Sequence, residues 1–334
     1  MLGLRFLQAS LLVPAHRIDA RAGARALPVR FEEVSRVKKP GRKASPQEVA
    51  DWKVAHKEMN LSTRAVQTMQ ALRAAMDAQG AAEKKLVIAG DGSFCNKVCF
   101  GTPVERTELL VRARKDCRLC LRAAQASSRC FYAKEKFTPE SVRADGNVPY
   151  LSGTFCYGGR ERELRYKEKS GVYWQGGAKR RELRLIVLAP TPYKRRGRTH
   201  YRAPAYLLTS DLDTPAEALI QIYLDRWQIE VNHREEKDTL GVGQAQCRNE
   251  RSVPRQPVLA VAAYSALLLA GLKAFGVHRS EAYAPLPRWR RSARRPSCLD
   301  LVARLRHEVE HHAHRLPFIL PKASPAQILR AAAA

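Results

Sequence analysis

Four side chains able to bind phosphate or metal ions recur at regular spacing in YLDRWQIEVNHREEK, residues 223–237. They are Tyr223, Arg226, Glu230 and Lys237. A helix turns by about 100° per residue, so the four side chains share a stripe about 60° wide on one face. Such a stripe forms either a solvated ladder of ion pairs or one wall of a site for metal ions and phosphates. The spacing alone favours the ladder.

The sequence predicts one uninterrupted helix to position this stripe. Thr214, Pro215 and Glu217 predict its start, as an N-cap, a first-turn proline and the glutamate of a capping box. Gly241 and Gly243 predict its end, because glycine accepts the left-handed conformation that closes a helix. The stripe is therefore expected on a rigid support.

The residues upstream predict an α/β unit. Strands are expected at 4–14 and 27–34, a helical region at 45–79, and further strands at 84–94 and 105–119. KKLVIAGDGSF, at 84–94, is a short apolar run that ends at a turn, which is typical of a buried central strand.

The rest of the chain divides into a β-rich and a helical part. Short runs rich in aromatic and branched residues, separated by Gly or Pro, predict a mostly antiparallel β region at 120–205. Helices are expected after residue 243 and again from 299 to about 315. VLAVAAYSALLLAGL, at 258–272, falls short of the roughly 18 to 20 apolar residues that span a bilayer and predicts a buried core helix, so no membrane partner is expected.

The charge of the chain indicates a polyanionic partner. Lys and Arg number 59 against 32 for Asp and Glu, which gives a net charge of +27 over 334 residues. The charge is clustered in KKPGRK, KRR, YKRRGR and RWRRSARR, a pattern that favours nucleic acid over a generally basic composition. An apolar fraction of 45% supports a folded core. The eight cysteines follow no signal peptide, so reduced thiols in a cytoplasmic protein are expected.

YLDRWQIEVNHREEKDTLG strongly resembles the Y-x2-R-x3-E-x6-K signature of insertion-sequence transposases of the DDE type. All four signature positions match, and so do the flanking RWQIE and the closing Leu240-Gly241. The resemblance extends over about residues 1–275. VIAGDGSF, at 87–94, is similar to the strand that ends in the second catalytic aspartate of that family, which makes Asp91 its counterpart.

The resemblance implies a fold and its domains. The fold class is α/β: a ribonuclease H-like mixed sheet with helices, interrupted by a mostly antiparallel β insertion and followed by a helical C-terminal part. The implied domains are a partial catalytic core at 1–119, the insertion at 120–205, the remaining core with the signature helix at 206–275, and a basic helical region at 276–334.

The resemblance also implies roles for the site residues. Asp91 and Glu230 would be catalytic and would hold two Mg²⁺ (or Mn²⁺) ions about 4 Å apart, one to activate the attacking oxygen and one to stabilise the leaving oxygen. Tyr223, Arg226 and Lys237 would bind DNA phosphates. The implied partners are transposon-end and target DNA and a second copy in a homodimer, in the cytoplasm near the nucleoid.

A DDE site needs a third acid, and the family's first aspartate has no counterpart in this sequence. The first core strand and its aspartate are expected to be missing, so the chain is expected to be N-terminally truncated and to show little or no transposition. Asp116 follows a strand, but neighbouring cations favour a surface ion cluster. Asp211 and Asp213 suit a turn and a cap. Glu235 and Glu236 lie off the stripe and are expected to be solvated.

Three functions are consistent with the sequence. The first is a DDE transposase, which uses metal ions to hydrolyse phosphodiester bonds and to transfer strands at the ends of an insertion sequence. The second is a basic nucleic-acid-binding protein without catalysis, or a transposase remnant, in which the charged stripe is structural. The third is a ribonuclease H-like nuclease of another family, which would cut nucleic acid without joining ends.

Overall fold

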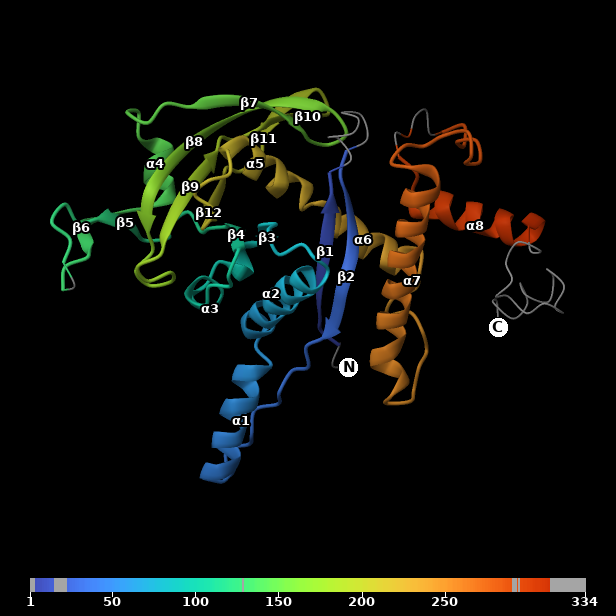
Figure 1. Ribbon diagram of the computed structural model, residues 1–334, viewed down its shortest axis with the longest axis horizontal. Coiled ribbons are helices and arrows are strands. Elements are labelled where there is room, and N and C mark those ends of the chain that lie inside the picture. Colours follow the sequence, from blue (N-terminus) through green and yellow to red (C-terminus); the bar gives the residue numbers. More distant parts are fainter. Residues whose placement is uncertain (1–3, 15–22, 128, 290–292, 294, 313–334) are drawn as a thin grey trace. The chain divides into compact units, whose positions relative to one another are not determined.

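The protein, in a computed structural model, forms two compact units (Figure 1). The structure describes residues 4–14, 23–127, 129–289, 293 and 295–312. The first unit comprises Met1–Leu12 and Arg30–Trp227. The second comprises the described residues of Val13–Val29 and Gln228–Ala334.

An eight-stranded mixed sheet forms the centre of the first unit, in the order β3-β4-β12-β9-β8-β5-β6, with β7 paired to β8. The strands are β3 (Leu86–Gly90), β4 (Thr107–Arg112), β5 (Leu119–Arg122), β6 (Tyr132–Phe137), β7 (Leu151–Cys156), β8 (Glu161–Tyr173), β9 (Glu182–Leu188) and β12 (Ala205–Thr209). β3 runs parallel to β4, whereas β12 is antiparallel to both β4 and β9. This mixed α/β arrangement is compatible with a ribonuclease H-like fold. The strands expected as an antiparallel insertion continue the same sheet as β3, β4 and β12.

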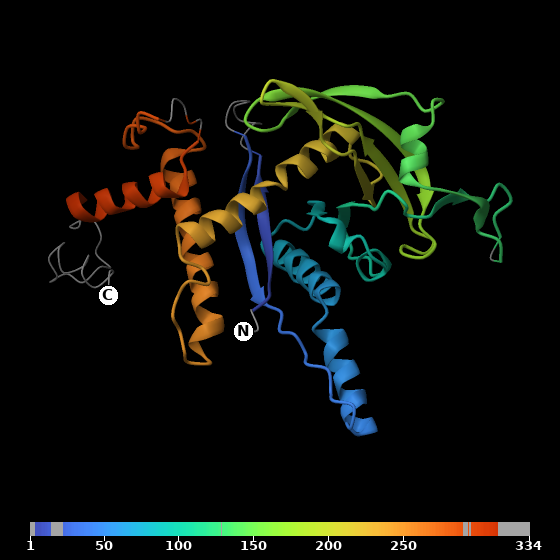
Figure 2. The ribbon, with the colours of Figure 1, turned by 180° about the vertical axis from the view of Figure 1, so that it is seen from behind.

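Helices cover both faces of this sheet (Figures 1 and 2). Side chains alternate along a strand, so Leu109 and Val111 of β4 join a core with α2 (Leu61–Ala78), whereas Leu110 joins a core with α5 (Ala216–Asp225). Burial on both faces explains why β4 and β9 are nearly continuous apolar runs rather than alternating ones.

Two predicted elements are each divided in the structure. The helical region at 45–79 forms α1 (Pro46–Glu58) and α2, because Asn60 caps a new helix by accepting from the N–H of Ser62. The predicted capping box of Ser45 and Glu48 begins α1. The strand expected at 105–119 ends at Arg112, and β5 begins separately at Leu119. Two short helices, α3 (Lys97–Gly101) and α4 (Pro139–Ala144), complete the unit's helices in the described part of the chain.

The two strands predicted near the start of the chain are confirmed as β1 (Phe6–Val13) and β2 (Arg25–Glu33). They form a two-stranded sheet separate from the eight-stranded one. In the first unit, Phe6 stacks on Phe31 with ring centroids 4.6 Å apart. Glu32 accepts hydrogen bonds from Arg64 and Thr68, which fasten this strand to α2.

Asp211, just after β12, is a buried carboxylate that organises the turn before α5. Its Oδ1 accepts from Lys85 Nζ at 2.8 Å and from the N–H groups of Asp213 and Thr214, and its Oδ2 accepts from Thr214 Oγ1. Burial by itself raises the pKa of Asp211, but these hydrogen bonds outweigh burial and hold the pKa below its ordinary value of 3.8. The turn role predicted for this residue is confirmed.

Replacing Asp211 with alanine is expected to lower the free energy of unfolding by about 3 kcal/mol at pH 7, because Lys85 and two N–H groups lose their acceptor. A carboxylate whose pKa is lowered by folding stabilises the folded state above its unfolded pKa, and this contribution is lost as the pH falls through the folded pKa. Urea unfolding between pH 7 and pH 3 should therefore show the difference between wild type and Asp211→Ala shrinking at the acid end. A difference that is the same at every pH would contradict this role.

The second unit is mainly helical, with α6 (Gln228–Asp238), α7 (Ser252–Phe275) and α8 (Cys298–His312). Its core includes Tyr264 and Leu268 of α7 and Leu301 of α8. Gly271 lets these helices approach closely, since a Cβ there would lie 2.5 Å from a terminal methyl group of Leu301. Part of the helix expected from 299 to about 315 lies outside the described residues.

One side of α7 is buried and the other is exposed. By length and composition alone, this helix is apolar enough to cross a membrane, and 22% of its most apolar window is buried. The buried side carries Val261, Tyr264 and Leu268, whereas Leu259 is 72% exposed. The prediction of a core helix thus holds for one side of α7.

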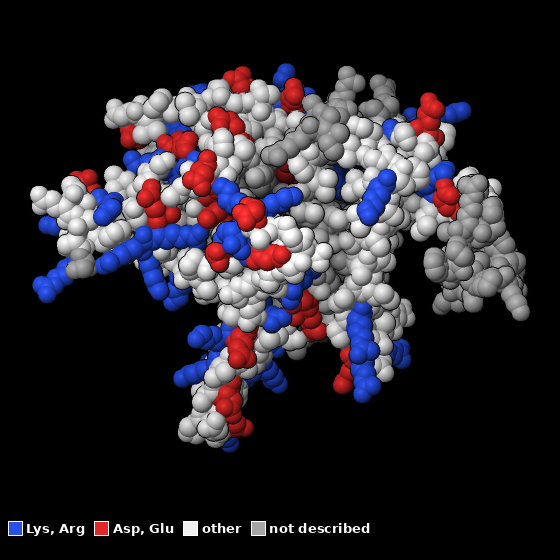
Figure 3. Space-filling model, in the orientation of Figure 1, with Lys and Arg blue, Asp and Glu red and all other residues white. Residues whose placement is uncertain are grey.

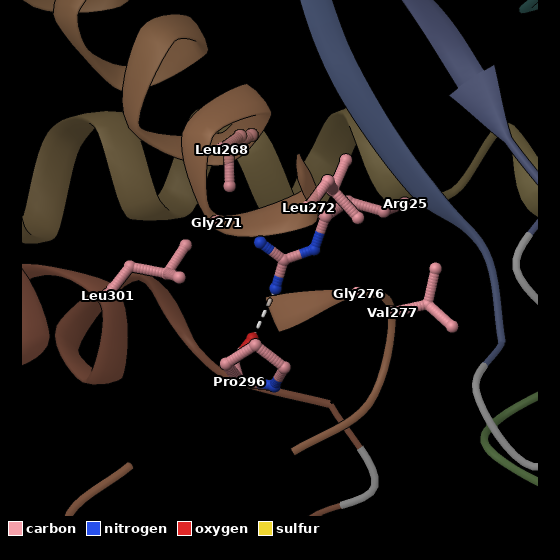
Figure 4. Close-up of a pocket in the computed structure, with 8 residues that line it drawn as sticks. All are labelled: Arg25, Leu268, Gly271, Leu272, Gly276, Val277, Pro296 and Leu301. Carbon is pink, nitrogen blue, oxygen red and sulfur yellow. Dashed lines mark hydrogen bonds between the residues drawn. The ribbon is translucent and has the colours of Figure 1, made fainter. Parts of the chain in front are cut away.

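A small cavity lies in the second unit beside α7 (Figure 4). The guanidinium of Arg25 enters it among apolar side chains such as Leu268 and Leu272, and donates to the carbonyl of Pro296. Its volume of about 10 Å³ leaves room for about one water molecule. The cavity is therefore too small for a substrate.

Candidate active site

Asp91 occupies the end of β3, where the sequence placed it. It is the N-cap of a short 3₁₀ turn at Gly92–Phe94, and its Oδ1 accepts from Ser93 N at 2.8 Å and from Ser93 Oγ at 2.5 Å. The residue is exposed, and its Oδ2 accepts no hydrogen bond from any residue that the structure describes. One oxygen thus fixes the side chain while the other is open to a ligand.

A side chain at Gly90, just before Asp91, would be crowded. A Cβ at Gly90 would lie 3.2 Å from both Phe94 and Val111. The strand, the following turn and β4 therefore approach one another closely at this point.

The register of the sheet determines which other acids share this edge. β3 and β4 are parallel, with Gly90 opposite Val111, so Asp91 is level with Arg112 and the residues after it. Asp116 follows on the same edge, but it pairs with Arg114 at 2.7 Å and its side chain is 58% exposed. The ion cluster predicted for Asp116 is present, and the hydrogen bond from Arg114 is the main cause of its lowered pKa.

Asp211 lies at the opposite edge of the sheet. β12 is antiparallel to β4, with Thr209 opposite Leu110, so the residues after β12 reach the start of β4. Lys85, which precedes β3, binds Asp211 there. The five residues of β3 separate this edge from Asp91 by roughly 16 Å. Asp211 therefore cannot share a metal site with Asp91.

The signature segment forms two helices, so the prediction of one continuous helix is wrong. α5 ends at Asp225 and α6 begins at Gln228, with Arg226 and Trp227 in the turn between them. The first compact unit also ends at Trp227. Local sequence did not show the break, because the residues from 223 to 237 include neither Gly nor Pro.

The predicted start of this segment is also different. α5 begins at Ala216 with Pro215 as N-cap and no side-chain cap, so the capping box is wrong. Thr214 donates to Asp211, and Glu217 accepts from Tyr166 instead. Thr214 and Glu217 thus each form a hydrogen bond with another residue instead of with each other's backbone. At the other end of the segment, Gly241 and Gly243 follow α6 with positive φ, as expected.

Tyr223 and Arg226 lie together in the first unit. The Arg226 guanidinium is 5.6 Å from the centre of the Tyr223 ring, a cation–π arrangement that holds both side chains in place. Tyr223 packs against the core cluster that includes Val87 of β3. The first unit therefore contains three of the predicted site residues: Asp91 after β3, Tyr223 on α5 and Arg226 in the turn that follows α5.

Glu230 and Lys237 lie on α6, in the second unit. Both are exposed. Their spacing of seven residues places them on one face of α6, about two turns apart. A carboxylate and an ammonium on one helix face suit contacts with a metal ion and a phosphate respectively.

The prediction that Glu235 and Glu236 are solvated is wrong. Tyr264 of α7 donates to Glu235, and Glu236 is only 2% exposed, with its Oε2 3.3 Å from Nδ1 of His233. α6 packs against α7, so the side of α6 away from Lys237 is turned inward. Charge alone did not reveal this packing.

From the sequence, Trp227 is recognised only as one of the residues flanking the signature positions. In the structure its side chain is 58% exposed in the turn between α5 and α6. An exposed tryptophan offers a flat surface for stacking against a nucleic-acid base. No signal in the sequence distinguished it from a core residue.

Basic side chains are spread over the face of the molecule shown in Figure 3, with acidic ones among them. Among the described residues, no group of three or more His, Cys, Asp or Glu side chains is placed to hold a metal ion. Asp91 and Glu230 are each suited to be one ligand, but they do not by themselves complete a metal centre.

Asp91 at the end of β3 and Glu230 on α6 are both exposed carboxylates, of the kind that a divalent metal ion can bind. Residues 138–266 match the family model of the transposase DDE domain. The match supports a DDE-type transposase, and that family implies a DNA substrate, transposition chemistry and, in general, divalent metal ions. No curated protein matches the chain.

Proposed function

We propose that this chain is a DDE transposase whose Y-R-E-K segment supplies the last catalytic acid, Glu230, with Asp91 as the second. Its chemistry is hydrolysis of phosphodiester bonds and strand transfer at the ends of an insertion sequence. The observation that carries the proposal is that the match to the transposase domain, at 138–266, includes the whole signature segment.

The side chains have distinct roles in this proposal. Asp91 and Glu230 would each supply a carboxylate ligand for Mg²⁺ or Mn²⁺, which when bound neutralises charge on the scissile phosphate. Arg226 and Lys237 bind DNA phosphates, Arg226 through its planar guanidinium and Lys237 as a point charge. Tyr223 orients Arg226 and offers its hydroxyl to a phosphate oxygen.

Activity of this chain by itself is proposed to be weak. Two carboxylates are fewer than the three that a DDE site uses, and fewer ligands hold a metal ion less tightly. We therefore expect little strand transfer without a further acid. We also propose that the protein acts as a homodimer on paired DNA ends, in the cytoplasm.

Asp91→Asn tests the catalytic assignment, because it keeps the hydrogen bonds to Ser93 possible while removing the charge that binds metal. We expect wild type to cleave duplex DNA slowly with Mn²⁺ and not with EDTA, and the variant to lose about 100-fold or more of this rate. Cleavage that persists at the wild-type rate in the variant would exclude Asp91 from the site.

A nucleic-acid-binding protein without catalysis is the second candidate. The observation in its favour is that the described residues contain no cluster of three metal-binding side chains. Metal-independent DNA binding with no cleavage by wild type, at any Mn²⁺ concentration, would support this candidate against the transposase.

A further inference from the structure

A basic β-hairpin extends from the first unit between β9 and β12 in the sequence. It consists of β10 (Pro192–Arg195) and β11 (Arg198–Tyr201), which form their own two-stranded sheet (Figure 1). All four residues of β11 are exposed, as are Lys194, Arg195 and the two turn residues. Neither face of the tip is used for packing.

The charge of this hairpin has one sign. Residues 190–204 contain five Lys and Arg residues and no Asp or Glu. Four of the five lie at or beside the turn: Lys194, Arg195, Arg196 and Arg198. None of these four forms an ion pair with any described residue, so their charge is compensated only by solvent ions.

Two features of the tip reduce the stability of the hairpin. Arg196 has φ +48° and Gly197 has φ +77°, a turn in which Asn-Gly is the favoured pair. A left-handed conformation is unfavourable for arginine, because its Cβ comes too close to the following carbonyl oxygen. Arg195 lies directly opposite Arg198, and facing like charges are also unfavourable. A bound polyanion would offset this repulsion. These residues therefore favour the binding of a polyanion, although they lower the stability of the free hairpin.

The base of the hairpin is held firmly by aromatic contacts. The Arg202 guanidinium lies 5.3 Å from the ring centre of Tyr157 and 5.6 Å from that of Tyr193, and it donates to the Tyr157 hydroxyl. Tyr193 stacks on His200 across the two strands, with ring centroids 5.5 Å apart. The charged tip is therefore presented on an ordered support, which lowers the entropy lost on binding.

We propose that this hairpin is a contact for double-stranded DNA that involves neither Asp91 nor Glu230. A two-stranded ribbon fits the major groove of B-DNA, which is about 12 Å wide. In this position Arg195, Arg196 and Arg198 bind backbone phosphates on either side of the groove and hold the duplex independently of its sequence. The inference rests on the proposed DNA substrate.

The test compares two triple variants that each remove three positive charges. One is Arg195→Gln/Arg196→Gln/Arg198→Gln, and its control is Lys53→Gln/Lys57→Gln/Lys134→Gln, at exposed positions of α1 and β6 outside the basic blocks. Affinity for a mixed-sequence duplex of about 30 base pairs is measured by fluorescence anisotropy over a range of NaCl concentrations, with EDTA present.

We expect the hairpin variant to bind at least about tenfold more weakly, with the slope of log K against log salt reduced by about 2 to 3. The control should change the slope by less than about 1. Equal losses in the two variants would show a general charge effect and overturn the proposal. So would unchanged duplex binding combined with lost binding to phosphatidylglycerol vesicles, which would assign the hairpin to a lipid surface.

Arg196→Asn separates binding from folding. Asparagine suits the left-handed turn, so the variant should melt no lower than wild type while its salt slope falls by about 1. If the slope of log K against log salt equals that of wild type, Arg196 does not contact the DNA. The binding proposal and the catalytic proposal can fail separately, because binding is measured with EDTA, which prevents metal-dependent cleavage. If the chain cleaves no DNA but its DNA binding still depends on the hairpin, this inference stands and the catalytic proposal fails.

Discussion

The Glu230→Gln variant is expected to lose metal-dependent cleavage of duplex DNA by about 100-fold or more, with its DNA affinity within about twofold of wild type. Glutamine has nearly the same shape as glutamate but lacks the charge that attracts a divalent ion. Glu230 is exposed on α6, so no buried charge is lost and the fold should be kept. The measurement is the cleavage rate with Mn²⁺, alongside anisotropy binding with EDTA.

Asp238→Asn is the matched control for this experiment. Asp238 is an exposed acid at the end of the same helix, outside the signature positions. Its variant should cleave at the wild-type rate. Equal losses in the two variants would show that Glu230 contributes only general charge, and a wild-type rate in Glu230→Gln would exclude it as a metal ligand.

Replacing Gly177 with alanine is expected to lower the free energy of unfolding by about 3 kcal/mol. A Cβ at this position would lie 2.2 to 2.4 Å from three atoms of the Trp174 ring. Trp174 cannot move freely, because it packs against the main core and contacts Phe100 edge-on at 5.8 Å. Urea unfolding should show a lower midpoint with an unchanged m value.

Gly176→Ala provides the control at the neighbouring position. A Cβ there would meet nothing closer than 3.8 Å, so its variant should be as stable as wild type or slightly more stable. The double variant Trp174→Ala/Gly177→Ala identifies the cause of the loss. If Gly177→Ala costs as much with Trp174 removed as with it present, the clash is not the reason for the destabilisation.

Much of the fold followed from local sequence. The apolar run at 84–94 correctly predicted a strand, β3, but the prediction that it is buried and central is wrong. β3 lies at one end of the sheet beside β4, and four of its five residues are only partly buried. The capping box at Ser45 began α1 as expected, since its hydrogen bonds lie within four residues. Asp91 also lies at a strand end, as the turn signal in VIAGDGSF indicated.

Predictions failed where distant residues competed with local ones. Thr214 and Glu217 have the types of a capping box, yet Asp211 and Tyr166 provide better partners in the folded chain. Glu236 looks solvated in sequence, but the packing of α6 on α7 buries it. Helical periodicity shows which residues of one helix share a face, but not which neighbouring helix packs against that face.

The sequence by itself determined the residue types of the site, their spacing and the basic charge of the protein. Only the tertiary structure decided which of the acidic residues lie at the same edge of the eight-stranded sheet. Asp91 and Asp211 each follow a short strand, but β3 runs parallel to β4 whereas β12 runs against it. The direction of β12 depends on its pairing with β4, about a hundred residues away in the sequence, so local patterns could not show that Asp91 and Asp211 lie at opposite edges.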